Sequence, residues 1–108
     1  MAKFMVKASY NADSVKGIVK EGGTGRVKVI TAMIEGMGGT LEGFYFAFGD
    51  TDVYVIVDLP GGTVDAAAVA AAVGSSGAMS KYETVTLLTP EEVDVAVKKA
   101  VDFRPPGS

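Results

Sequence analysis

The chain has 108 residues, 48% of them hydrophobic, which suits a single domain spanning residues 1–108. Its formal net charge is −3, and its basic residues form no run longer than Lys98-Lys99, so nucleic acid is not expected as a partner because phosphate binding needs clustered basic side chains. Without cysteine or histidine the chain has no disulfide, thiol nucleophile, imidazole base or usual transition-metal ligand, and we expect no cofactor.

We expect a cytoplasmic protein. Lys3 and Lys7 interrupt the apolar residues near the start, which argues against a signal peptide. No apolar stretch is long enough to cross a bilayer, so a membrane is not an expected partner.

The first third of the chain predicts one strand and two helices. Residues 3–10 alternate between apolar and polar side chains, as a half-buried strand does. Asn11 is a suitable N-cap for a short helix that Gly22-Gly23 ends. Thr24 is expected to cap a second helix, which stops at a group of glycines near Gly38.

Residues 40–48 and 53–59 predict a β-hairpin joined by the turn at 49–52. One face of its first strand is expected to carry three aromatic side chains, those of Phe44, Phe46 and Phe48. Thr63 is expected to cap an alanine-rich helix that ends near Val73.

The last third predicts a strand over residues 81–88 and a C-terminal helix. Thr89-Pro90-Glu91-Glu92 forms a capping box with proline at the first helical position. Apolar residues then follow at helical spacing: Val93, Ala96, Val97, Ala100 and Val101.

The predicted order β-α-β-β-α-β-α indicates an α+β, ferredoxin-like βαββαβ fold with an added C-terminal helix. Right-handed crossovers give an antiparallel four-stranded sheet in the order 4-1-3-2, with the main helices on one face. The opposite face is expected to carry a large apolar patch of interface residues: Met5, Phe44, Phe46, Phe48, Ile56, Val85 and Leu87.

Such a patch is larger than monomers normally expose, and each large side chain left in water forfeits about 1.5–3 kcal/mol. We therefore expect a homodimer or higher homo-oligomer in which two sheets face each other, as in a dimeric α/β barrel. The alternative is that the C-terminal helix folds back over this face, although one short helix covers four strands poorly.

Several motifs resemble the GYD domain family. The residues that carry the resemblance are Lys20-Glu21-Gly22-Gly23, Phe44-Tyr45-Phe46-Ala47-Phe48-Gly49, Asp52-Val53-Tyr54-Val55-Ile56, Leu88-Thr89-Pro90-Glu91-Glu92 and the tail Phe103-Arg104-Pro105-Pro106-Gly107. The resemblance implies a small bacterial protein of the dimeric α/β barrel type and carries little chemistry. Thr51 stands where the family's naming motif has an aromatic residue, so a site through that position does not carry over.

Charged residues offer three candidate sites. Lys7 and Glu83 are expected on paired strands, with Asp58 near one end, either as acid and base in a dry barrel or as a solvated ion pair. The glycine-rich turn before Arg26 either binds an anion or is only a helix kink with Thr24 as the cap. Asp50 and Asp52 in the hairpin turn favour backbone bonding over a cation site.

Phe44, Phe46 and Tyr54 are expected to line either a pocket for a small apolar molecule or an interface. The function favoured by these residues is a homo-oligomeric binding or structural protein without a catalytic set. The alternative is a cofactor-independent enzyme, monooxygenase- or isomerase-like, that uses Lys7, Glu83, Asp58 or a tyrosine on an apolar ligand in the barrel cavity. In a third interpretation the Pro-rich tail docks a partner.

Overall fold

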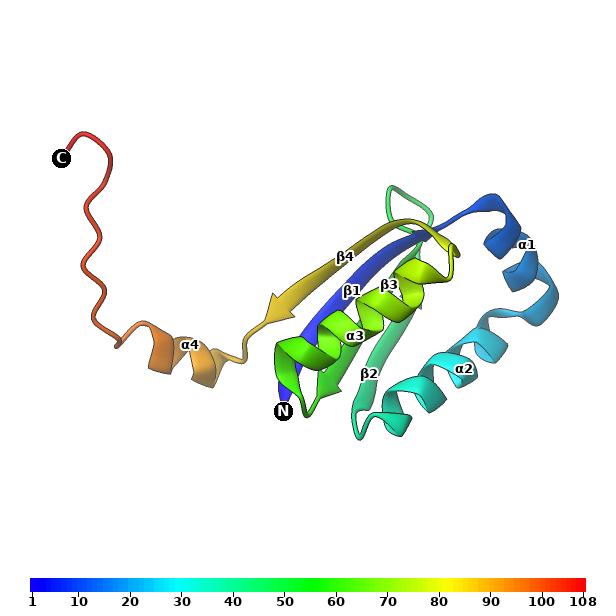
Figure 1. Ribbon diagram of the computed structural model, residues 1–108, viewed down its shortest axis with the longest axis horizontal. Coiled ribbons are helices and arrows are strands. Elements are labelled where there is room, and N and C mark those ends of the chain that lie inside the picture. The colour runs from blue at the N-terminus through cyan, green and yellow to red at the C-terminus, as the bar shows by residue number, and fades with distance from the viewer.

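A computed structural model of all 108 residues contains one four-stranded antiparallel sheet, four helices and an extended C-terminal tail (Figure 1). The elements follow in the order β1 (Ala2–Tyr10), α1 (Ala12–Glu21), α2 (Gly23–Gly36), β2 (Thr40–Phe46), β3 (Val53–Leu59), α3 (Gly62–Ser75), β4 (Met79–Leu87) and α4 (Pro90–Ala96). The sheet order β2-β3-β1-β4 is the predicted 4-1-3-2 order, so the α+β fold class is confirmed. The sheet of one chain is open and forms no closed barrel.

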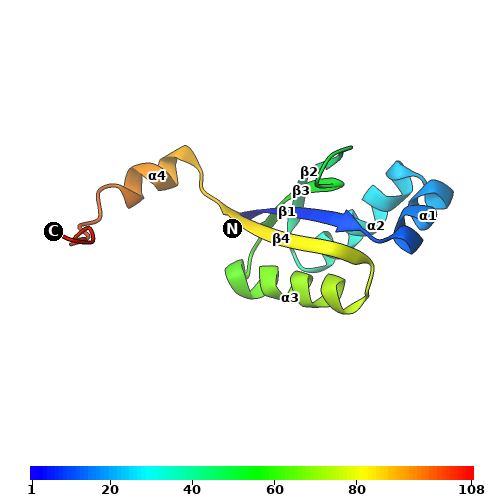
Figure 2. The same ribbon diagram turned by 90° about the horizontal axis from the view of Figure 1, so that it is seen from above.

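Strand β1 lies at the centre of the sheet and pairs with β3 on one side and β4 on the other. Its alternate residues Phe4 and Ala8 are buried against α2 and α3, which pack on the same face (Figure 2). The core consists of the residues that this face and the two helices bury: Phe4, Ala8, Ile34, Val53, Val55, Val57, Leu59, Ala66 and Val69. No helix covers the opposite face.

A β-bulge in β2 overturns one prediction about the two faces. The register of β2 against β3 shifts between Leu41 and Gly43, which leaves Glu42 as an extra residue. A shift of one residue moves the following side chains to the other face, so Phe44 lies opposite the core residue Val55.

The expected placement of Phe44, Phe46 and Phe48 on the uncovered face is therefore wrong. Phe44 packs against the core, and Phe46 lies opposite Val53 on the same, helix-covered face. Phe48 lies beyond the end of β2, in the hairpin loop, and is fully exposed. Tyr45 takes their place on the uncovered face, directly opposite Tyr54.

The helix starts agree with prediction where a side chain caps them and differ where glycine does. The carbonyl oxygen of the Asn11 side chain accepts a hydrogen bond from the Ser14 backbone N–H, as predicted. Helix α2 follows Gly22, at φ 83°, instead of being capped by Thr24. Helix α3 begins one residue before Thr63, because the N–H of the preceding Gly61 donates to the Asp65 carboxylate at 2.7 Å.

Helix α4 begins with the predicted capping box, in which Thr89 and Glu92 each bind the other's backbone N–H. It ends at Ala96 instead of near Val101, and its side chains are exposed. Figures 1 and 2 show α4 and the tail projecting away from the sheet, so α4 does not fold back over the uncovered face. A short helix without a packing partner gains little from tertiary contacts, which accounts for its early end. No helix is both long and apolar enough to cross a membrane.

Gly39, between α2 and β2, offers a test of the packing. A methyl group there would lie 2.5 Å from the Asp58 carbonyl oxygen and 3.1 Å from Ile34 Cγ2. Gly39→Ala is expected to lower the free energy of unfolding by about 1–3 kcal/mol, as overpacking does. The control is Gly17→Ala in α1, where the new methyl group meets open space and should stabilise by about 0.5–1 kcal/mol. Urea denaturation measures both, and a Gly39→Ala variant as stable as the wild type would contradict this account.

Candidate functional site

The structure distributes the predicted site residues over three places. Lys7, Tyr54 and Glu83 lie together on the uncovered face of the sheet. Phe44 lines an apolar cavity on the helix-covered face, and Arg26 lines a polar groove beside α1. The residues offered as candidate ligand contacts therefore lie in separate places, and Phe46 lines neither hollow.

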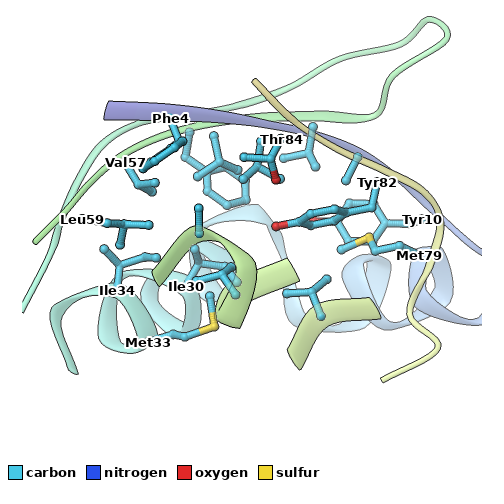
Figure 3. Close-up of a pocket in the computed structure, with 18 residues that line it drawn as sticks. Phe4, Tyr10, Ile30, Met33, Ile34, Val57, Leu59, Met79, Tyr82 and Thr84 are labelled. Carbon is cyan, nitrogen blue, oxygen red and sulfur yellow. The ribbon is translucent and has the colours of Figure 1, made fainter. Parts of the chain in front are cut away.

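The apolar cavity lies between the sheet and helices α2 and α3, and its volume is about 50 Å³ (Figure 3). The sheet contributes Phe4, Phe44 and Val55, while Ile30 comes from α2 and Val69 from α3. All but one of the lining residues are hydrophobic, and no charged residue is among them. Ligand pockets in proteins are typically apolar with a few placed polar groups, and this cavity has that character on a small scale.

Tyr82 supplies a polar atom to this cavity. It lies opposite Ala8 across the β1–β4 pair, and its Oη is buried without a hydrogen-bond partner in the chain. Burial raises the pKa of Tyr82, and the nearby Thr84 side chain opposes that rise, so the hydroxyl is neutral and protonated at neutral pH. Thr84, two residues along β4, is the remaining lining residue that is not hydrophobic (Figure 3).

An unsatisfied buried hydroxyl costs about 1–3 kcal/mol, so native proteins rarely keep one without a reason. Tyr82 was not among the site residues predicted from the sequence. Tyr82 and Thr84 are two positions apart in β4, so both side chains point to the face that the helices cover, and this spacing could have indicated Tyr82.

Arg26 lies in a separate polar groove of about 170 Å³ between α1, the start of α2 and the end of β1. Tyr10 and Glu21 line the same groove. Burial raises the pKa of Tyr10, and the positive charge of Arg26 opposes that rise. Because the Glu21 carboxylate shares the groove with Arg26, its negative charge weakens the attraction of this turn for an anion.

On the uncovered face, which we call the open face, Lys7 lies directly opposite both Tyr54 and Glu83. Its Nζ is 4.0 Å from the nearer carboxylate oxygen of Glu83, and the side chain of Glu83 is about half exposed. This geometry is that of a partly solvated ion pair. The apolar side chains of the open face are Met5, Tyr45, Tyr54, Ile56, Val85 and Leu87.

A second charged group on the open face was not predicted. Lys3 Nζ lies 3.1 Å and 3.2 Å from the two carboxylate oxygens of Asp58 and also contacts the Glu42 carboxylate. Hydrogen bonding with Glu42 and then with Lys3 lowers the pKa of Asp58. The bulge brings Glu42 into this group, and a bulge leaves no clear mark in the alternation of a sequence.

One of the two aspartates of the hairpin turn binds a backbone group through its carboxylate. The Asp52 carboxylate accepts the Tyr10 N–H at 3.0 Å, while the backbone carbonyl oxygen of Asp50 accepts from the Ser9 hydroxyl at 3.0 Å. These bonds hold the turn against the end of β1, and Thr51 between the two aspartates is buried. The backbone group that Asp52 binds belongs to β1 and not to its own turn.

Comparison with known proteins identifies a family. A family model described as GYD domain matches residues 4–97 of the chain, which confirms the resemblance seen in the sequence. Neither the curated proteins nor the solved structures contain a significant match.

The Lys3 group predicts a pH-dependent contribution to stability. Lys3→Met is expected to lower the free energy of unfolding at pH 7, because Glu42 and Asp58 then lie side by side without a cation. The folded-state pKa of Asp58 is below its ordinary value of 3.8, so its stabilising contribution is present above that pH and is lost as the pH falls through the folded-state pKa.

The deficit of Lys3→Met relative to the wild type should therefore shrink as the pH falls below 3.8. Urea unfolding followed by circular dichroism across this range measures it. Lys16→Met is the control, since Lys16 is exposed and forms none of the ion pairs. An equal deficit at all pH values would contradict the assignment.

Proposed function

The chain belongs to the GYD domain family, and we propose that it is a homodimeric binding protein whose two copies pack through the open faces of their sheets. One observation carries this proposal: apolar side chains from β1, β3 and β4 lie on a face that no helix covers. Met5, Ile56 and Val85 are direct neighbours across these three strands. A second copy would remove them from water, which favours association by about 25 cal/mol per Å² of apolar surface buried.

Charge also supports a second copy as the occupant. Lys7 is paired with Glu83 and Lys3 with Asp58 and Glu42, all within one face. Burying an unpaired charge is costly, but Lys3 and Lys7 bring their own carboxylates. Lys81 lies opposite Ser9 on the same face without an ion pair, but it is exposed and near the end of β4. Two such faces can therefore meet with Lys81 left in water at the edge of the contact.

The size of the face indicates that the C-terminal segment takes part. Four strands spaced ~4.8 Å apart, with ~3.3 Å per residue over the seven residues of β3, cover roughly 19 by 23 Å. The projected area is roughly 440 Å², while a stable interface buries roughly 800 Å² on each partner. Exposed apolar residues of the projecting segment, such as Val93, Val97 and Phe103, supply further surface for the partner copy.

The enzymatic alternative has less support. Its proposed acid and base, Lys7 and Glu83, lie on the open face, so its substrate would have to lie between two facing sheets, and the sheet of one chain forms no closed barrel there. The apolar cavity within one chain lies on the helix-covered face, where the sheet separates it from these two groups. Proton transfer needs the acid or base within hydrogen-bond reach of the substrate.

The assembly is tested by light scattering coupled to gel filtration. The wild type is expected at about twice the chain mass of 11.1 kDa. Ile56→Lys is expected to shift the mass towards the monomer, because it places a charge without a partner at the centre of the open face. Val64→Lys, on the exposed surface of α3, is the control and should stay dimeric.

Circular dichroism of both variants shows whether they keep the fold. A wild type that runs as a monomer at high micromolar concentration would overturn the dimer. So would a folded Ile56→Lys variant with unchanged mass.

The role of the C-terminal segment has its own test. A chain ended at Leu88, without α4 and the tail, is expected to dimerise more weakly because the remaining face is small. A chain ended at Phe103 keeps α4 and serves as the control, with dimerisation like the wild type. Sedimentation equilibrium gives both dissociation constants, and equal values would show that α4 adds nothing to the interface.

A further inference from the structure

We propose that the cavity between the sheet, α2 and α3 binds slim, mostly apolar molecules that carry one uncharged oxygen, such as short-chain alcohols or ketones, with Tyr82 Oη as their polar contact. Two independent observations meet in this cavity. One is an almost wholly hydrophobic lining contributed by the sheet and both helices. The other is a buried hydroxyl in that lining without a hydrogen-bond partner.

The volume limits the shape of the ligand. An apolar cavity of ~150 Å³ holds a benzene ring. The present cavity of about 50 Å³ is a third of that size, so a molecule of two or three carbon atoms fits it better than an aromatic ring. A water molecule would find the hydroxyls of Tyr82 and Thr84, the fewest partners that buried water usually has, and would leave the apolar part of the cavity empty.

The lining also limits the charge of the ligand. No Lys, Arg, Asp or Glu lines the cavity, and burying an ionised group without a partner is very costly. Carboxylates and amines are therefore excluded. The Tyr82 hydroxyl can donate to a ketone or alcohol oxygen and can accept from an alcohol, and either contact removes the cost of leaving it unsatisfied.

This inference rests on the proposed function in so far as that is a binding function, and it names the ligand class. It does not depend on the dimer, since the cavity and the open face lie on opposite sides of the sheet. Scattering measures the assembly and a ligand titration measures the cavity, so failure of one is distinguishable from failure of the other.

The test is an NMR titration of the full-length protein with two probes, ethanol and xenon. Both are expected to shift methyl resonances of cavity residues such as Val55 and Val69. Tyr82→Phe is expected to weaken ethanol binding about three- to tenfold, the effect of one neutral hydrogen bond. Xenon, which has no oxygen, should bind Tyr82→Phe as it binds the wild type.

Tyr45→Phe is the matched control, because it removes the hydroxyl of an exposed tyrosine on the open face. Its affinity for both probes should equal that of the wild type. Ala66→Leu is expected to fill the cavity and abolish binding of both probes. Val73→Leu, at the end of α3, provides a second filling variant if Ala66→Leu does not fold.

Three results would overturn the proposal. The first is equal ethanol affinity of Tyr82→Phe and the wild type. The second is probe-induced shifts confined to the open face. The third is undiminished binding in a folded, cavity-filled variant.

Discussion

The structure depends on a central strand whose two sides differ. Phe4 is only 2% exposed under the helices, while its neighbour Met5 lies between Lys3 and Lys7 on the face that they leave open. Strand β1 lies between β3 and β4 and cannot turn either row of side chains outward without breaking its ladders of backbone hydrogen bonds. Helices α2 and α3 remove the apolar row from water, whereas Met5 and its neighbours Ile56 and Val85 have no helix over them.

This constraint separates the molecule into two functional faces. On the helix side, the two helices and the sheet leave a small apolar space with a tyrosine hydroxyl in its wall. On the open side, apolar side chains are interrupted by Lys3 and Lys7, which already have carboxylate partners. The first face has the character of a pocket for a small uncharged molecule, and the second that of a contact between like copies.

A single extra residue in β2 changes both faces at once. The bulge at Glu42 allows Leu41 and Phe44 to share the helix-covered face, although they are three positions apart in the sequence. It also places the Glu42 side chain beside Lys3 and Asp58, where hydrogen bonding with Glu42 lowers the pKa of Asp58. Bulges redirect side chains in this way at little cost in backbone hydrogen bonds, and here the redirected side chain becomes part of the cavity wall.

Local patterns were enough to predict the elements, their order and the topology of the sheet, because alternation, glycine stops and capping side chains such as Asn11 and Thr89 act within a few residues. They were also enough to place Lys7 opposite Glu83, since strand order and alternation determine that pair. The face of Phe44, the group around Lys3 and the buried hydroxyl of Tyr82 were decided only in three dimensions. Each depends on the register of one strand against another that is remote in the chain, or on which side chains surround an atom after packing, and alternation within a single strand contains neither.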